Sequence, residues 1–274
     1  MTERTELAQR RARLSPAKQA RLAEWITGEG RRRSIQRRRD PAPARLSFAQ
    51  ERLWFMEQLL PGTHANELPT ALTLAGPLDL DVLDRALTEI VRRHDALRTR
   101  FPAPGGRAVQ VVDPPWPVTL PLVEPDDDAP AFDLAADRLI RLSLARTGPH
   151  EHQLRVLAHH IVSDAWSQRL MVHELAALYE AFAAGRASPL TELPIQYADF
   201  AVWQRDQLAG PVLTAQLDYW RAQLAGPPPV LELPADRPRP TVPTYGGATL
   251  RRRLPAPLLT ALRELAQRTN TTFY

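Results

Sequence analysis

Several long segments of the chain repeat an apolar residue every three or four positions, which is the spacing of one face of an α-helix. The clearest segment covers residues 164–182, and its apolar face consists of Leu170, Met171, Leu175, Leu178 and Phe182. Gly185 follows as a signal that ends the helix. The same spacing predicts a helix at residues 81–94, and further helices are expected at residues 196–208, 212–224 and 257–268.

Two earlier helices are predicted with residues that can cap them. In residues 14–25, Ser15 can be the N-cap and Pro16 the first helical residue. Another helix is expected from residue 46 onward, with Ser47 able to cap it. Its shared face consists of Ala49, Leu53 and Met56.

Short runs rich in β-branched and aliphatic residues predict β-strands. They cover residues 70–74, 97–101, 108–112, 118–122, 139–145, 153–158 and 248–254. A short helix is expected near Ala135. Because helices and strands are mixed along the chain without an internal repeat, the expected fold class is a layered α/β or α+β structure.

The pattern divides the chain into four parts. Residues 1–40 form a basic leader with one helix, which we expect to be partly disordered. Residues 41–233 form the main lobe, and a proline-rich connector follows at residues 234–247. Residues 248–274 hold one strand and one helix, which we interpret as the start of a second lobe.

Composition limits the classes of protein and of chemistry. The 274 residues, of which 44% are hydrophobic, can bury a substantial core. No run of 18 apolar residues occurs, and the first residues lack the basic-then-apolar order of a signal peptide, so we expect a cytoplasmic protein without a membrane segment. The chain has no cysteine, which leaves Ser, His, Asp, Glu and Lys to carry any chemistry.

The positive charge is concentrated in the leader. Residues 1–40 hold eleven arginines and one lysine against five acids, a net charge of +7, so the remaining residues carry −3 of the total of +4. The leader is either a solvated tail or a basic arm for nucleic acid or a carrier surface. The body of the protein is not expected to bind nucleic acid.

Two adjacent histidines stand where a predicted buried strand meets a helix. His159 and His160 follow residues 153–158, and Asp164 lies four residues after His160. Strand ends commonly hold functional side chains, because the rigid backbone aims them at a cleft. Adjacent residues on a strand point to opposite faces, so we expect one histidine to face a channel and the other the interior.

Four segments carry patterns that occur in a fixed order. They are SFAQERLWF at residues 47–55, RHDALRTRF at 93–101, HHIVSD at 159–164 and YADFAVWQ at 197–204. Together they resemble the motifs of the condensation domains of nonribosomal peptide synthetases, which belong to the chloramphenicol acetyltransferase-like superfamily. The resemblance runs from about residue 14 to residue 274.

This resemblance implies two acetyltransferase-like lobes with a channel between them. Thioesters enter from opposite ends, and the acceptor amine attacks the donor thioester to form an amide. It implies that His160 faces the channel as the catalytic residue and that His159 is structural. His160 then acts as a general base, or it positions the reactants and stabilises the tetrahedral intermediate. Asp164 is expected to form a structural ion pair, with Arg98 as its partner.

The resemblance also implies the partners. Substrates arrive on the phosphopantetheine of donor and acceptor peptidyl carrier domains, beside an adenylation domain, and no cofactor is bound directly. Condensation domains are longer than the matching region. We therefore expect this chain to be a fragment with weak or no activity alone.

The residues after the histidine motif refine this picture. The family usually has glycine where Ala165 stands. If the φ angle of Ala165 is negative, its methyl group has a mild effect; if φ is positive, the methyl group strains the backbone and narrows the channel. Trp166 and Ser167 resemble the subtype that joins two L-configured residues.

Other interpretations remain open. His159 and His160 with the nearby Asp164 could suggest a metal site, and His173 lies on the following helix. A strand–helix junction separates the two histidines and no third ligand has diagnostic spacing, so we expect no metal. The chain could instead be a non-catalytic module that docks a carrier or a neighbouring domain, or a stand-alone acyltransferase for a soluble alcohol or amine. Patterns typical of hydrolases and of nucleotide or NAD binding are absent from the sequence.

Several further motif residues are expected to be structural. His94 should cap or pack the end of its helix. Trp54, Tyr197 and Trp203 should fill the core or support the lobe, and Asp199 should form structural hydrogen bonds.

Overall fold

The computed structural model describes residues 34–40, 42–123, 130–227, 234–238, 241, 248, 250 and 252–273. The chain divides into two compact units, Met1–Pro228 and Pro229–Tyr274. The helix expected at residues 14–25, most of the basic leader and most of the connector at residues 234–247 lie outside the described residues.

The larger unit is built around a three-stranded antiparallel sheet. Its order is β2 (Glu67–Ala75), β6 (Glu151–His159), β5 (Ile140–Gly148), so that β6 is the central strand. In the register of the sheet, His159 lies opposite Glu67. The central strand therefore fixes the backbone up to the first histidine of the motif.

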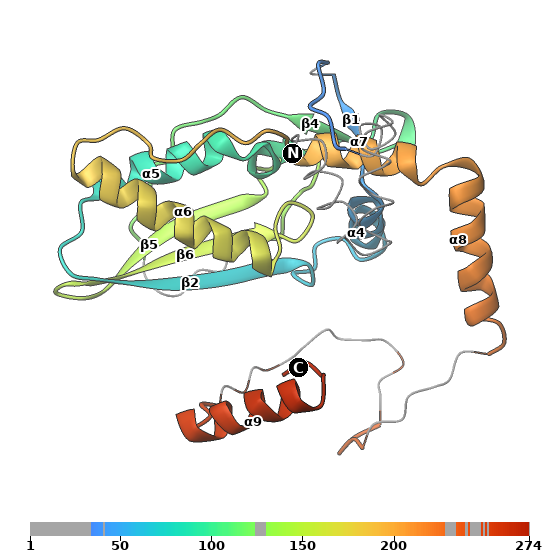
Figure 1. Ribbon diagram of the computed structural model, residues 1–274. Helices are drawn as coiled ribbons and strands as arrows, with labels where there is room; N and C mark the ends of the chain where they lie inside the picture. Colours follow the sequence, from blue (N-terminus) through green and yellow to red (C-terminus); the bar gives the residue numbers. More distant parts are fainter. Residues whose placement is uncertain are drawn as a thin grey trace, which may run out of the picture. The chain divides into compact units, whose positions relative to one another are not determined.

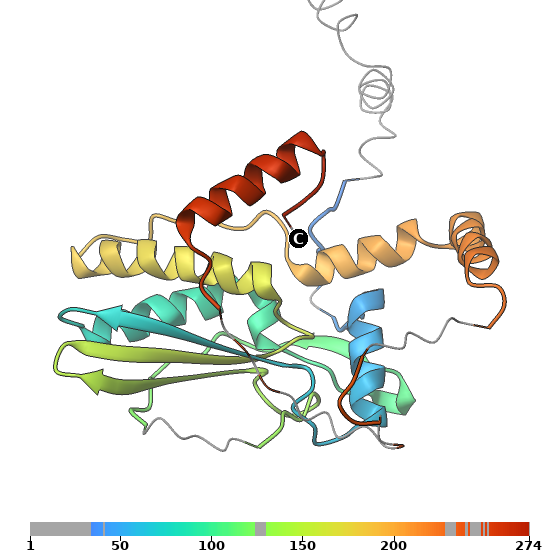
Figure 2. The ribbon, with the colours of Figure 1, turned by 90° about the horizontal axis from the view of Figure 1, so that it is seen from below.

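Two long helices cover one face of this sheet. They are α5 (Leu80–Arg93) and α6 (Ala165–Ala183), which pack against each other and lie on the same side of the strands (Figures 1 and 2). Their inward residues meet those of the strands in one core, whose buried members include Leu83, Leu87, Ile90, Leu154, Val156, Leu175 and Leu178. The 3.6-residue spacing of the sequence thus predicts both helices correctly.

A second, smaller layer completes this unit. It contains the sheet β1 (Ala44–Arg45), β4 (Val109–Val112), β3 (Thr99–Arg100), and helix α4 (Phe48–Leu59) follows β1 directly. A second apolar cluster lies here and includes Leu46, Phe101, Phe132, Ile161 and Val162. This cluster joins the small sheet to the turn that follows β6.

Two more helices follow α6. Helix α7 (Tyr197–Gln207) packs against β1, and α8 (Gly210–Gln223) has no buried residue. Asp199 is buried at 5% exposure and accepts hydrogen bonds from the backbone N–H of Gln196 at 2.7 Å and of Arg38 at 2.9 Å. The structural role expected for Asp199 is confirmed. Arg38, near the end of the leader, is thus hydrogen-bonded to the main lobe.

The smaller unit contains helix α9 (Ala256–Arg268), within one residue of the range expected from the sequence. The strand expected at residues 248–254 is wrong for the described part of that range, namely residues 248, 250 and 252–254. A β-strand needs a hydrogen-bonding neighbour, and the two sheets of the described residues include none from this unit.

Three short elements also differ from the sequence predictions. The range 97–101 is mostly the 3₁₀ helix η1 (Asp95–Arg98), followed by the two residues of β3. The range 118–122 forms only one isolated parallel bridge, between Leu122 and Leu144. Pro121 has no N–H, and the N–H groups of Val118 and Leu120 donate to side chains of α5. The helix expected near Ala135 is a turn.

In the described part of the chain, every helix is either too short or too polar to span a bilayer.

Candidate active site

The two histidines of the motif point to different sides of the chain. His159 is the last residue of β6 and is buried, with 2% of its surface exposed, whereas His160 is exposed in the turn that follows. The alternation of a strand predicts this difference. The structure therefore separates a histidine inside the core from a histidine at a cavity.

The contacts of His159 define its protonation. Its Nδ1 accepts a hydrogen bond from the backbone N–H of Ile161 at 3.1 Å, so the ring proton is on Nε2. Nε2 donates to Oε1 of Glu57 at 3.2 Å, and this oxygen also accepts a hydrogen bond from Asn66 at 2.7 Å. Burial lowers the pKa of His159, although Glu57 opposes this effect. His159 is therefore a neutral residue that shapes the turn.

His160 lines a cavity, and the backbone engages one of its ring nitrogens. Its Nδ1 lies 2.8 Å from the carbonyl oxygen of Ser163, and because a carbonyl only accepts, Nδ1 carries the proton. Its backbone N–H donates to the carbonyl of Asn66 at 2.8 Å. In the neutral ring Nε2 then has a free lone pair, and Nε2 has no hydrogen-bond partner among the described residues.

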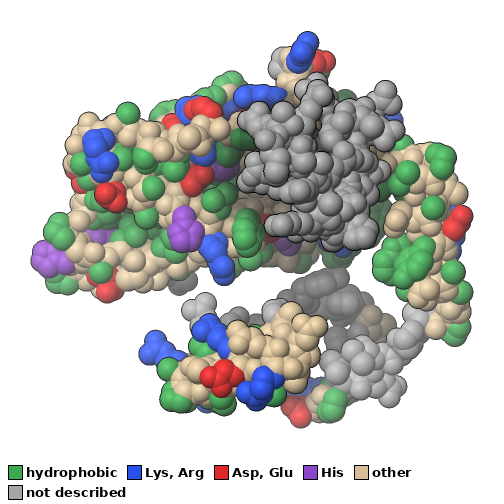
Figure 3. Space-filling model, in the orientation of Figure 1, with side chains coloured by type: hydrophobic (Ala, Val, Ile, Leu, Met, Phe, Trp, Pro, Cys, Tyr) green, Lys and Arg blue, Asp and Glu red, His purple; other side chains and the backbone are tan. Residues whose placement is uncertain are grey.

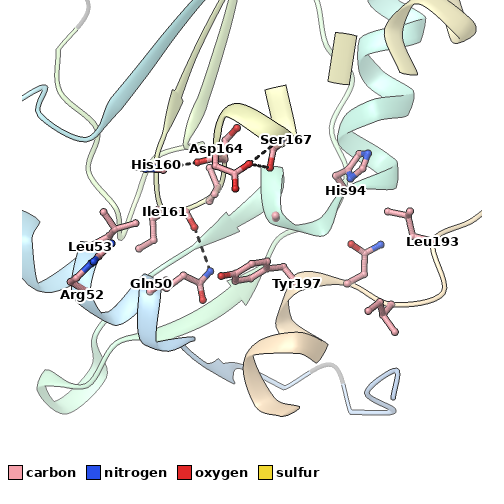
Figure 4. Close-up of a pocket in the computed structure, with 16 residues that line it drawn as sticks. Gln50, Arg52, Leu53, His94, His160, Ile161, Asp164, Ser167, Leu193 and Tyr197 are labelled. Carbon is pink, nitrogen blue, oxygen red and sulfur yellow. Dashed lines mark hydrogen bonds between the residues drawn. The ribbon is translucent and has the colours of Figure 1, made fainter. Parts of the chain in front are cut away.

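The cavity beside His160, called the site cavity, has a volume of about 410 Å³. Its walls come from α4, the end of α5, the turn after β6, the start of α6 and the start of α7, and in Figure 4 Gln50 and Tyr197 lie across from Asp164 and Ser167. The lining residues include Gln50, Leu53, His94, His160, Ser163, Asp164, Ser167, Leu193, Gln196 and Tyr197. Segments that are far apart in the sequence thus line one cavity together with His160.

Asp164 is the N-cap of α6 and not the partner of Arg98. Its Oδ1 accepts hydrogen bonds from the backbone N–H and from the hydroxyl of Ser167, both at 2.7 Å. The Ser167 hydroxyl is the largest cause that lowers the pKa of Asp164, followed by the Ser167 N–H. The N-cap position satisfies this carboxylate locally, because the first turn of a helix presents unpaired N–H groups.

The expected ion pair between Asp164 and Arg98 is therefore wrong. Arg98 binds the carboxylate of Asp95 and the carbonyl oxygen of Asp113. The 3₁₀ helix η1 brings Asp95, three residues earlier, beside Arg98, so that a local partner takes the guanidinium. Arg98 is not among the residues that line the site cavity.

The residues after Asp164 begin α6. Ala165 is its first helical residue, and among the described non-glycine residues only Asn270 has a positive φ. The alanine is therefore unstrained, which corresponds to the milder of the two expectations. Trp166 is 75% exposed, and Ser167 lines the site cavity.

Helix α4 contributes polar residues that the sequence analysis missed. The expected face of Ala49, Leu53 and Met56 is not the buried one, because Gln50 and Glu57 are buried and Met56 is 38% exposed. Gln50 completes a capping box with Ser47 and donates to the side chain of Gln110 at 3.1 Å. Tyr197 bonds the same Ser47 through its hydroxyl at 3.0 Å. The sequence signal for these buried polar residues was the weak separation of apolar and polar positions along the helix.

A buried ion pair beside the site cavity was also missed. Arg93 and Glu174 are 6% and 7% exposed, and their side chains lie 3.1 Å apart. Glu174 also accepts a hydrogen bond from Nε2 of His94 at 2.7 Å. His94 is the C-cap of α5, as expected, and it also lines the site cavity. The sequence signal was a glutamate on the inward side of α6.

The described surface carries charges of both signs. Figure 3 shows positive and negative side chains interspersed over the described part of the face that it displays. Among the described residues, no three His, Cys, Asp or Glu side chains come together in a group that could hold a metal ion.

The sequence of this chain is similar to those of known proteins. A family model described as "Condensation domain" matches residues 42–274. A linear gramicidin synthase protein of Brevibacillus parabrevis is 41% identical over 254 residues, which cover 86% of this chain and 5% of that protein. The chain thus spans a small part of this relative.

Two solved structures show the same fold. The X-domain from teicoplanin biosynthesis gives a TM-score of 0.72 at 30% identity, covering 87% of this chain and 56% of that chain. The first condensation domain of the CDA synthetase gives a TM-score of 0.67 at 24% identity, covering 85% and 59%. The expected fold class, a layered α/β lobe of the chloramphenicol acetyltransferase-like type, is confirmed.

Proposed function

Because the chain belongs to the condensation-domain family of nonribosomal peptide synthetases, we propose that its site cavity forms an amide bond between two carrier-bound substrates. Condensation domains catalyse this acyltransferase reaction within synthetase modules that also contain carrier domains. The observation that carries the proposal for this chain is the orientation of His160. Its Nδ1–H is bonded to Ser163, which leaves Nε2 as a proton acceptor at the cavity.

We propose the following steps, with His160 as the general base. The acceptor amine attacks the carbonyl carbon of the donor thioester, and a C–N bond forms. His160 Nε2 accepts a proton from the amine, which removes the positive charge from the attacking nitrogen. The tetrahedral intermediate then breaks its C–S bond, and the imidazolium returns the proton to the departing thiolate. The products are an amide and a free thiol, so the imidazole is regenerated.

We propose the partners and substrates from the same family role. The donor and the acceptor are held on the phosphopantetheine of two peptidyl carrier domains, and an adjacent adenylation domain loads the acceptor. The pattern around the histidines supports two L-configured residues as substrates. The lack of cysteine is compatible with the cytoplasm as the location, where thiols stay reduced.

The test is amide formation with two loaded carrier proteins. The full chain is joined to the remaining part of the condensation domain of a relative, because it spans 56% and 59% of the two solved chains described above. Donor carriers bear an L- or a D-aminoacyl thioester, and acceptor carriers bear an L-aminoacyl thioester. Mass spectrometry of the acceptor carrier detects the dipeptidyl product.

The proposal predicts a dipeptidyl thioester on the acceptor carrier only when both carriers are loaded, with the L-donor preferred. A folded fusion that transfers the acyl group to water or to a free alcohol, and never to the acceptor amine, would contradict it. Circular dichroism of the fusion and of the unfused chain establishes that the protein tested is folded. A preference for the D-donor would overturn the subtype alone.

A further inference from the structure

A second, smaller cavity adjoins the site cavity and is called the apolar cavity. Its volume is about 110 Å³, and it lies between the end of α5, the start of α6 and strands β5 and β6. Five lining residues belong to both cavities, namely His94, Ala96, Val162, Ser163 and Ser167. The apolar cavity is therefore a continuation of the site and not a separate hollow.

The lining of the apolar cavity changes in character beyond this shared boundary. The residues that line it alone are aliphatic or Met, such as Ile90, Ile140 and Met171, with the exception of the exposed Trp166. Cavities lined in this way hold no firmly bound water and accept apolar groups, because a water molecule needs several polar partners. At about 30 Å³ per water-sized group, the cavity holds about four such groups, which is the size of a valine or leucine side chain.

The boundary residues fix this cavity relative to the reacting atoms. The carbonyl of Ser163 holds the ring of His160 at 2.8 Å, and Glu174 holds the ring of His94 at 2.7 Å. Both imidazoles are thus oriented where the two cavities meet. A substrate whose reacting carbon lies near His160 could extend a short side chain past Ser163 into the apolar cavity.

We infer that the apolar cavity binds the short aliphatic side chain of one of the two aminoacyl units that are joined. This inference rests on the proposed function and specifies its substrate class. The donor and the acceptor share the required chemistry, and the experiment distinguishes them. Ala158, a fully buried residue of β6, is one of the residues that line the apolar cavity.

The first measurement uses the full 274-residue chain and does not depend on catalysis. Leucyl-, alanyl- and aspartyl-pantetheine amides are titrated, and methyl NMR follows Met171, which lines the apolar cavity. Met56, on the exposed side of α4, lines neither cavity and is the internal control. We expect the leucyl probe to shift the Met171 methyl resonance and to bind about ten-fold more tightly than the alanyl probe.

Two alanine-to-valine variants of the chain provide the matched comparison. Ala158→Val adds two methyl carbons at a residue that lines the apolar cavity, and Ala181→Val adds them at a buried position of α6 that lines neither cavity. We expect Ala158→Val to remove the preference for the leucyl probe and Ala181→Val to retain it. Both variants carry the same risk of overpacking, which thermal unfolding measures.

The outcome is decided separately from the proposed function. Equal binding of the three probes, or a leucyl preference that survives in Ala158→Val, would overturn the side-chain inference even if the fusion forms amides. If Ala158→Val does not fold, the test rests on the original chain. The absence of any shift of the Met171 methyl resonance with the leucyl probe would then overturn the inference. In the fusion, leucine in place of alanine on the donor alone, then on the acceptor alone, identifies which substrate uses the cavity.

Discussion

At the scale of single residues, the turn after β6 uses two imidazoles in opposite ways. His159 donates from Nε2 to Glu57 and accepts at Nδ1, so both nitrogens are engaged inside the core. His160 is fixed through Nδ1 alone and leaves Nε2 at the site cavity. The first histidine shapes the backbone and the second is available for chemistry.

The neutral state of His159 predicts a pH dependence of folding. Burial lowers its pKa in the folded protein below the value of about 6.5 that it has when unfolded. The unfolded chain therefore binds a proton that the folded chain rejects, and the stability from His159 is complete above about pH 6.5 and decreases as the pH falls toward the folded pKa. Urea unfolding of the chain at pH 7.5 and pH 5.5 should show this loss.

The control for this prediction is His159→Gln, which keeps a polar side chain that does not titrate. We expect its free energy of unfolding to change less between the two pH values than that of the original chain. An equal change in both proteins would show that His159 is not the group responsible. The acidic loss from Asp164 falls in a lower window, because its lowered pKa puts that loss below about pH 4.

Asp164 provides a second prediction at this scale. Removing the cap by Asp164→Ala should lower the free energy of unfolding by about 1 kcal/mol, since the Ser167 N–H loses its acceptor. Asp164→Asn should have a smaller effect because it keeps an acceptor. In a double-mutant cycle with Arg98→Ala, the two effects should add within about 0.5 kcal/mol. A coupling energy well above that value would be evidence for an ion pair between Asp164 and Arg98 and would contradict the structure.

The sequence predicts the residue-scale features only where they are local. Ser47, beside its own helix start, follows from nearby spacing and is confirmed as a cap. Arg98 was assigned to a distant partner, because one sequence cannot show that the 3₁₀ helix offers Asp95 first. Glu57 lies 102 residues from the His159 that it binds, a separation that no periodicity reveals.

At the scale of elements, α5 and α6 are held together by a buried charge cluster as well as by apolar packing. Arg93 at the end of α5 binds Glu174 of α6, and the same carboxylate binds His94. Arg93 also donates to the carbonyl of Thr191, which leads into α7. The carboxylate of Glu174 thus holds Arg93 and His94 in place, and His94 lines the site cavity.

Breaking this cluster should destabilise the fold strongly. Glu174→Ala leaves the buried Arg93 without its counter-ion, and we expect a loss of about 3–5 kcal/mol in the free energy of unfolding. The matched control on the same helix is Glu180→Ala, because Glu180 pairs with Arg186 at the surface and should contribute less than about 1 kcal/mol. Similar losses for both variants in urea unfolding would refute the structural role of the buried pair.

Element prediction succeeds where a segment carries its own pattern. Helices α5 and α6 repeat their apolar positions over several turns, and the structure places them within a residue of the expected bounds. Strands depend on partners. Residues 118–122 resemble a strand by composition, yet Pro121 has no N–H, and the N–H groups of Val118 and Leu120 donate to side chains of α5. The prediction of which side of α4 is buried was wrong, because the buried residues of this helix are polar.

At the scale of the whole molecule, the site cavity depends on the meeting of segments that are separated in sequence. The sequence motifs at residues 47–55, 93–101, 159–164 and 197–204 each contribute a lining residue, such as Gln50, His94, His160 and Tyr197. The resemblance of these motifs predicts the family correctly. It does not predict the apolar cavity, whose walls include core residues outside the four motifs, such as Ile140 and Met171.

The central claim is that amide formation depends on the free Nε2 of His160. The most direct measurement is the single-turnover rate of dipeptide formation on the acceptor carrier, in the fusion, for His160→Ala and for His173→Ala. His173 lies exposed on α6 and outside the site cavity, so it controls for loss of a histidine. The account predicts a rate at least about 100-fold lower for His160→Ala and an unchanged rate for His173→Ala. A folded His160→Ala variant that forms the amide at the original rate would contradict it.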